Sequence, residues 1–135
     1  MSHKPRTVLL GLLVLLGFAL PARAHHSFQA EFDESKQFQL TGVLTKVDWI
    51  NPHIRFFLDV KDADGKVTTW DLDTVAPTIY HRAGLTRTFV KVGDTYTVTV
   101  CAAKDGSKNL AFVKTWKYPD GHTVNVWFGD PGQLK

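Results

Sequence analysis

Residues 54–73 read IRFFLDVKDADGKVTTWDLD, and this stretch predicts a β-hairpin. Apolar and polar side chains alternate in its first half, which is the period of a strand with one buried face. The expected inward residues are Ile54, Phe56, Leu58 and Val60. Asp64-Gly65 supplies a tight turn, and the return segment carries Trp70 and Leu72 on one face. We therefore expect two paired strands at the centre of the fold.

A further strand is expected ahead of the hairpin, at residues 38–50. The residues expected to share one of its faces are Thr41, Val43, Thr45, Val47 and Trp49. Gly42 lies near its start and permits a bend or a bulge there. Asn51-Pro52 then ends this strand before the hairpin begins.

One short helix is expected after the hairpin, within residues 76–84. Pro77 at its opening and Gly84 at its close match the end preferences of helices. Three more extended runs follow, at residues 95–102, 110–118 and 124–128. The chain therefore reads as three strands, one helix and then two or three strands.

This order predicts a mainly β protein with an OB-fold-like barrel of five to six strands and one short helix after strand three. A β-sandwich uses similar strands but has no natural place for the helix, so it is the less favoured fold. We expect residues 25–135 to form this single domain. Its N-terminal arm, about residues 25–36, is not an obvious strand and carries Phe28 and Phe32 as its large apolar groups.

The first 24 residues predict a signal peptide. Lys4 and Arg6 precede an uncharged apolar run, and Ala22-x-Ala24 fits the specificity of signal peptidase. The run is shorter than the roughly 20 residues that a membrane-spanning helix needs. We therefore expect export, with no membrane span once the leader is removed.

The charge of the mature chain argues against a nucleic-acid partner. Removing Lys4, Arg6 and Arg23 with the leader reduces the 16 basic side chains to 13, equal to the 13 acidic ones. A neutral chain without a basic cluster lacks the charge that phosphate binding needs. Cys101 is the only cysteine, so no disulfide forms within the chain. Strand alternation places Cys101 on the face away from the core, as a small strand residue and not as a metal ligand or redox thiol.

Histidines provide the first candidate site. Cleavage after Ala24 would give His25 a free α-amine beside its own imidazole, and such nitrogen ligands suit copper, nickel and zinc. His26 is the nearest further ligand in sequence. His53 is the preferred distant one, because Pro52 stiffens its loop. Two weaker candidates are His81 and His122. The ordinary alternative is that a terminal histidine pair binds metals only weakly and that His53 holds its own loop by hydrogen bonding.

Aromatic residues provide the second candidate site, formed by Trp49, Phe57 and Trp70. OB-folds use exposed aromatic side chains on strands two and three to bind ligands. Phe57 occupies the polar phase of its strand, so it is either exposed or covered by the arm that carries Phe28 and Phe32.

The chain resembles DUF6152, a family of small exported bacterial proteins of unknown function. The motifs that carry the likeness are His25-His26-Ser27-Phe28, Glu31-Phe32-Asp33, Leu40-Thr41-Gly42, Trp49-x-Asn51-Pro52-His53, Asp62-x-Asp64-Gly65, Trp70, Arg82-x-Gly84, Gly93-Asp94 and Lys104-Asp105-Gly106-Ser107. The resemblance implies a periplasmic or secreted location in a bacterium and supplies no catalytic residues.

The sequence therefore predicts a periplasmic binding module that takes a transition metal, with copper preferred, through His25, His26 and His53. Recognisable motifs for a nucleophilic serine, a zinc hydrolase or a phosphate-binding loop are absent from the sequence, which makes an enzyme the less favoured reading. One alternative is a non-metal module that binds a small molecule, a glycan or an exported protein through Trp49, Phe57 and Trp70. The other is a copper-dependent redox enzyme with a terminal histidine brace.

Overall fold

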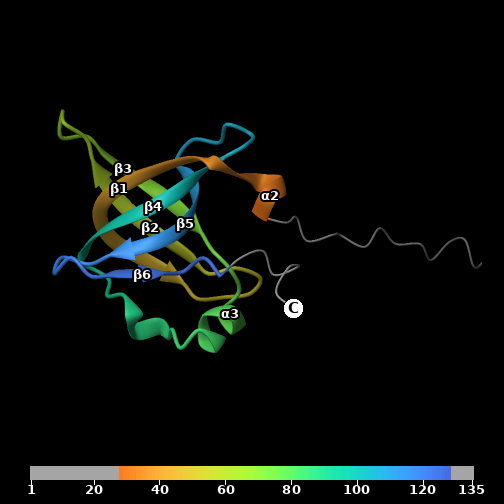
Figure 1. The fold of residues 1–135 in the computed structure, drawn as a ribbon. Helices are drawn as coiled ribbons and strands as arrows, with labels where there is room; N and C mark the ends of the chain where they lie inside the picture. The colour runs from red at the N-terminus through yellow and green to blue at the C-terminus, as the bar shows by residue number, and fades with distance from the viewer. Residues whose placement is uncertain (1–27, 129–135) are drawn as a thin grey trace, which may run out of the picture.

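The computed structural model describes residues 28–128 and is mainly β, with few short helices (Figure 1). The predicted leader, His25 and His26 lie outside the described residues. The elements are α2 (Phe28–Glu31), β1 (Phe32–Asp48), β2 (Arg55–Lys61), β3 (Val67–Asp73), α3 (Pro77–Arg82), the 3-10 turn η1 (Arg87–Phe89), β4 (Thr95–Ala103), β5 (Leu110–Lys117) and β6 (Thr123–Asn125).

All six strands belong to one sheet, in the order β3-β2-β1-β4-β5-β6 with antiparallel neighbours. An additional parallel pairing joins β3 to β5, with Leu72 opposite Ala111. This pairing brings the first strand of the order beside the fifth, and the buried apolar side chains form one core cluster. The described residues therefore do not form the two separate sheets of a β-sandwich.

The expected hairpin is confirmed as β2 and β3. Phe56 pairs with Leu72 and Leu58 with Trp70, and the side chains of Phe56, Leu58 and Leu72 are fully buried. The Asp62 carboxylate accepts hydrogen bonds from the backbone N–H groups of Asp64 and Lys66, at 3.0 and 2.9 Å. The turn chemistry thus fixes the register that the alternation of the two strands requires.

The short helix is confirmed as α3, which lies with η1 at one end of the sheet (Figure 1). Pro77 occupies its first turn, and Gly84 follows it with a φ of +79°. A left-handed conformation of this kind is readily adopted by glycine and closes the helix. Within residues 28–128, no helix is long and apolar enough to cross a membrane.

β1 begins earlier than expected, at Phe32, and ends at Asp48. The expectation that residues 32–36 lie outside a strand is wrong. These residues are mostly polar, so the sequence gives no sign of the pairing with β4. Phe32 and Asp33 pair with Ala103 and Ala102, and the register then shifts before Gln37. A bulge at this point interrupts the alternation that normally reveals a strand.

A second register shift in β1 lies between Leu44 and Lys46. The residues that the sequence predicts on one face therefore do not all lie on the same face of the strand. Thr41, Val43 and Thr45 are exposed, whereas Trp49 is buried. The extra residue of a bulge moves every later side chain to the opposite face, so the single predicted face is wrong.

Gly42 allows β1 and β2 to approach each other closely, and it does not itself form the bulge. A Cβ atom here would lie 2.9 Å from the carbonyl carbon of Asp59 in β2 and closer still to its oxygen. β1 pairs with β4 up to Val43 and with β2 from Val43 onward, so Gly42 lies where the strand passes from one partner to the other.

The N-terminal aromatic residues cover β5 and do not cover Phe57. The Phe28 ring lies 4.7 Å from that of Phe112 and 4.3 Å from that of Trp127. Phe57 lies instead below the Lys46 ammonium, which is 4.9 Å from the ring centroid. The idea that Phe28 and Phe32 cover Phe57 is therefore wrong.

Cys101 is fully buried, although strand alternation predicts that it faces away from the core. Its pairing partner in β5 is Phe112, whose ring packs against Phe28 and Phe32. This layer of aromatic side chains covers the outer face of β4 and β5, and the resulting burial raises the pKa of the Cys101 thiol.

The sixth strand is also shorter than expected, since it ends at Asn125.

Candidate functional site

A cleft of about 610 Å³ lies between α2, the loop before β2 and the turn between β4 and β5. Its lining includes Glu31, Phe32, Pro52, His53, Asp73 and Asp105. Elements far apart in the sequence meet here, because β1 runs from the end of α2 to the loop that carries His53. The lining is partly apolar, and three of its six polar side chains are carboxylates.

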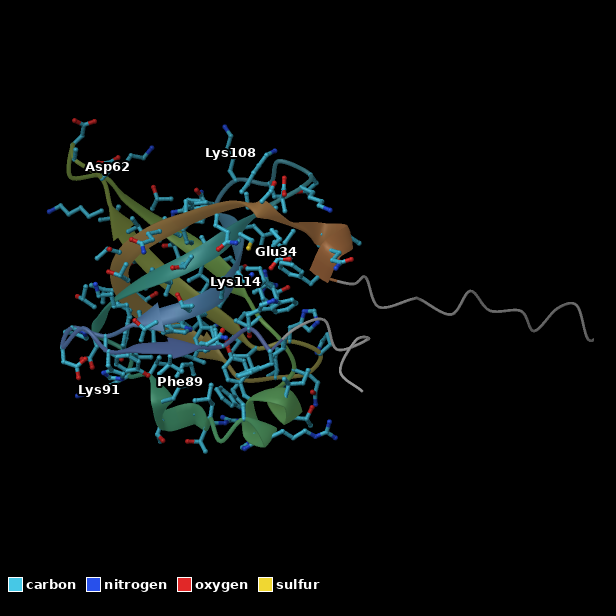
Figure 2. The ribbon with its side chains drawn as sticks, viewed as in Figure 1. Glu34, Asp62, Phe89, Lys91, Lys108 and Lys114 are labelled. Atoms are coloured by element: carbon cyan, nitrogen blue, oxygen red, sulfur yellow. The ribbon has the colours of Figure 1, made fainter. Side chains whose placement is uncertain are left out.

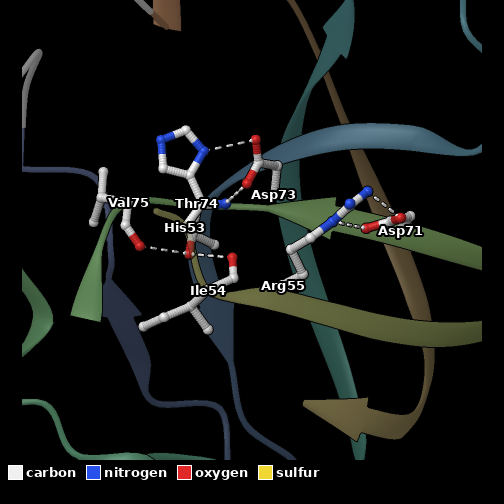
Figure 3. Close-up of polar contacts among 7 residues, drawn as sticks. All are labelled: His53, Ile54, Arg55, Asp71, Asp73, Thr74 and Val75. Carbon is white, nitrogen blue, oxygen red and sulfur yellow. Dashed lines mark hydrogen bonds and ion pairs between the residues drawn. The ribbon is translucent and has the colours of Figure 1, made fainter. Parts of the chain in front are cut away.

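His53 is held in this cleft by Asp73, the last residue of β3. Hairpin pairing places Arg55 opposite Asp73, so the loop residue two positions earlier also lies beside the end of β3. The His53 Nδ1 atom lies 3.2 Å from Asp73 Oδ2, and the Thr74 N–H donates to Asp73 Oδ1 at 2.9 Å (Figure 3). The carboxylate is thus anchored by the backbone and in turn orients the imidazole.

The hydrogen bond to Asp73 is the main reason that the pKa of His53 is raised above its ordinary value of 6.5. The negative charges of Asp73 and Glu31 act in the same direction, while partial burial and the positive charge of Arg55 oppose the rise. With Nδ1 engaged, the other ring nitrogen points away from Asp73 (Figure 3). A carboxylate behind Nδ1 is the support commonly found behind histidines that bind metals through Nε2.

The charge balance of the cleft favours a cationic ligand. Three carboxylates line it, from Glu31, Asp73 and Asp105. Arg55 is also part of the lining, but both of its terminal contacts go to Asp71, including an Nε to Oδ1 hydrogen bond of 2.9 Å (Figure 3). Its positive charge is therefore largely offset within the hairpin.

The other described histidines do not join His53. His81 lies on α3, with its ring 6.1 Å from that of Trp49. His122 stacks on Tyr118 at 3.9 Å and bonds to Asp120 in its own turn. Within the described part of the chain, no three histidine, cysteine or carboxylate side chains are arranged to hold a metal ion.

The three candidate aromatic residues do not form one surface. Trp49 is only 8% exposed and packs against Tyr80, with 5.5 Å between the ring centroids. Phe57 and Trp70 point to opposite faces of the hairpin, since Trp70 pairs with the buried Leu58. Trp70 instead meets Phe38 of β1, at 5.6 Å between ring centroids.

Sequence reasoning missed Asp73, Glu31 and Asp105 as parts of the cleft. Asp73 had a usable signal, because a hairpin centred on residues 62–65 necessarily brings the end of β3 beside the start of β2. Glu31 and Asp105 had none, since their approach to His53 depends on the pairing of β1 with β4.

These observations define a mainly β protein with an acidic cleft that contains a histidine. The chain belongs to DUF6152, a family of unknown function, whose family model matches residues 13–111. No curated protein and no solved structure matches the chain.

Proposed function

We propose that this protein is an exported bacterial binding module that takes copper in the cleft between α2 and His53. The single observation that carries the proposal is that Ala30 and Glu31 of α2 line the same cleft as His53. α2 is the first described element after the predicted cleavage site, and a chain that begins at His25 would have only two residues between His25 and Phe28, where α2 starts.

The proposed ligands are the α-amine and imidazole of His25, with His26 and His53 completing the set. Removal of residues 1–24 would create the free amine. Three residues of chain span at most about 10 Å, so a terminus at His25 stays close to Phe28. Imidazole and amine nitrogens are good ligands for Cu(II), and the acidic lining would favour a cation.

Asp73 supports His53 in this role as a positioning residue. Its hydrogen bond with Nδ1 favours the neutral tautomer in which Nε2 carries the free electron pair. A bound copper ion would be a Lewis acid and a one-electron redox centre, but binding alone is the function proposed.

We further infer that the sheet closes as an OB-like barrel. Three features support this inference: the pairing of β3 with β5, the position of α3 between β3 and β4, and the passage of β1 from one partner strand to the other. The cleft lies at the β1–β2 and β4–β5 loops, which are loops that OB-folds use for ligands.

The test is a Cu(II) titration followed by electron paramagnetic resonance, on mature protein that begins at His25. Matched samples carry one extra residue ahead of His25, His53→Ala, or the control substitution His122→Ala. Intact mass of the exported protein checks independently that residues 1–24 are removed.

We expect one equivalent of Cu(II) with nitrogen hyperfine structure, lost in the extended protein and weakened by His53→Ala. His122→Ala should bind like the unsubstituted protein, because His122 bonds within its own turn. Cu(II) binding that is unchanged by both the extension and His53→Ala would refute the proposed site.

A further inference from the structure

A second hollow, of about 300 Å³, adjoins the cleft and is lined by different chemistry. It lies between Phe38, Trp70 and the turn that joins β4 to β5. The two hollows share Ala103 and Leu110 in their linings. We refer to the second hollow, lined by Phe38, Trp70, Leu110 and residues 106–109, as the aromatic groove.

The rings in the aromatic groove are fixed but incompletely covered. Trp70 lies on the inward face of β3, like Leu72, yet Leu72 is fully buried and Trp70 is only partly buried. Phe38 comes from β1, which is not a neighbour of β3, and meets Trp70 edge-on with 60° between the rings. A held aromatic ring with an open face is a preorganised surface for a planar ligand.

The rim of the groove is held in place by β3. The Asp71 N–H donates to the carbonyl oxygen of Asn109 at 2.8 Å. Asn109 has a φ of 58°, a left-handed conformation that asparagine tolerates better than most residues. Asp105 Oδ1 accepts the Ser107 N–H at 2.8 Å, which stabilises the first part of the turn. The rim therefore has a defined shape beside Trp70.

The charge of the groove is opposite to that of the cleft. Lys108 is the one charged residue in the groove lining within residues 28–128, and no carboxylate contributes to that lining. Lys108 is exposed on the turn and forms no ion pair with the described residues (Figure 2). Its ammonium is free to meet an anionic group on a bound molecule.

We propose that the aromatic groove binds a planar aromatic ring that carries an anionic group, such as an aromatic carboxylate. The ring packs against Trp70 and Phe38, and the carboxylate pairs with Lys108 at the rim. This site is distinct from the proposed copper site, because His53 does not line the groove and neither Trp70 nor Lys108 lines the cleft.

The test uses benzoate, benzamide and benzylamine as probes, which present one ring with an anionic, a neutral and a cationic substituent. Binding is followed by nuclear magnetic resonance on nitrogen-15-labelled protein, through the indole N–H of Trp70 and the backbone N–H groups of residues 106–109. We expect benzoate to perturb these signals at millimolar concentration and to bind more tightly than the other two probes.

Two substitutions separate the contributions of ring and charge. Lys108→Gln should weaken benzoate about two- to fivefold, the value of an exposed ion pair, and leave benzamide unchanged. Trp70→Leu should weaken both probes roughly three- to tenfold, while Trp70→Phe should restore much of the loss. Lys117→Gln, at an exposed position of β5, is the matched charge control and should have no effect.

Equal binding of all three probes would overturn the anionic preference. Signal changes confined to His53 and its neighbours, or no change in the Trp70 signal, would refute binding in the aromatic groove. Lys108→Gln lies on an exposed turn and tests the charge even if the Trp70 variants fold poorly.

Discussion

The carboxylate of Asp73 faces the Nδ1 atom of His53 across 3.2 Å, at the point where β3 ends and β2 begins. This contact links the hairpin to the cleft, because Asp73 belongs to a strand and His53 to a loop. It determines both the orientation of the imidazole and the direction in which the pKa of His53 is shifted.

Asp73→Asn should lower the pKa of His53. An amide neither carries the negative charge nor accepts the hydrogen bond as strongly, and the hydrogen bond is the largest contribution to the raised pKa. The pKa is measured from the imidazole resonances during a pH titration. Asp59→Asn is the control within the hairpin, since Asp59 accepts a hydrogen bond from Thr69 and its charge is not among those that shift the pKa of His53. An unchanged pKa in Asp73→Asn would mean that the contact does not form in solution.

The same contact should make stability depend on pH. A raised pKa in the folded state means that His53 binds a proton more tightly in the folded protein than in the unfolded chain. The stabilisation is complete below the ordinary pKa of 6.5 and is lost as the pH rises through the raised pKa of the folded state.

Urea unfolding of the unsubstituted protein and of Asp73→Asn measures this effect. The difference between their free energies of unfolding should be larger at mildly acidic pH than at alkaline pH. Comparing the two proteins at each pH cancels the contribution of exposed carboxylates such as Asp105 and Asp120, whose pKa values are lowered by hydrogen bonds in their turns. A difference that grows with pH would contradict the assignment.

Gly42→Ala should destabilise the fold by about 1–3 kcal/mol, the usual cost of forcing extra volume into a packed region. The added methyl group would meet the backbone of Asp59, which cannot move without disturbing the pairing of β1 with β2. Urea unfolding measures the change. Gln39→Ala, at an exposed position of the same strand, should have little effect. Similar free energies of unfolding for both variants would show that the two strands tolerate a wider separation.

Tyr80→Phe should leave stability unchanged or raise it by up to about 1 kcal/mol, because it removes a buried hydroxyl that costs desolvation. The Tyr80 hydroxyl has no partner at hydrogen-bonding distance and angle among the described residues, and burial raises its pKa more than the nearby Thr74 side chain lowers it. Tyr96→Phe is the contrasting variant, since the Tyr96 hydroxyl accepts the Lys91 N–H at 2.9 Å.

We expect Tyr96→Phe to lose about 1 kcal/mol, the net value of one hydrogen bond. Thermal and urea unfolding of both variants provide the comparison. A larger loss in Tyr80→Phe than in Tyr96→Phe would reveal a partner for the Tyr80 hydroxyl.

The sequence alone determined the β2–β3 hairpin and the helix α3. Both depend on interactions within a few residues: the alternation of apolar side chains, the backbone hydrogen bonds of Asp62, and the positions of Pro77 and Gly84. Local chemistry of this kind can be read directly, because the residues that interact are also neighbours in the chain. The sequence also predicts His53 as a candidate ligand, and this stays a prediction, whereas its contact with Asp73 was not predicted.

The tertiary structure alone decided which side chains face the core beyond the hairpin and which residues meet at the cleft. The bulge after Leu44 moved Trp49 into the core, and the layer formed by Phe28 and Phe112 buried Cys101 from its outer side. Each of these outcomes depends on strand register or on contacts between distant residues. A one-residue change of register reverses every later side chain, so periodicity within one segment cannot fix them.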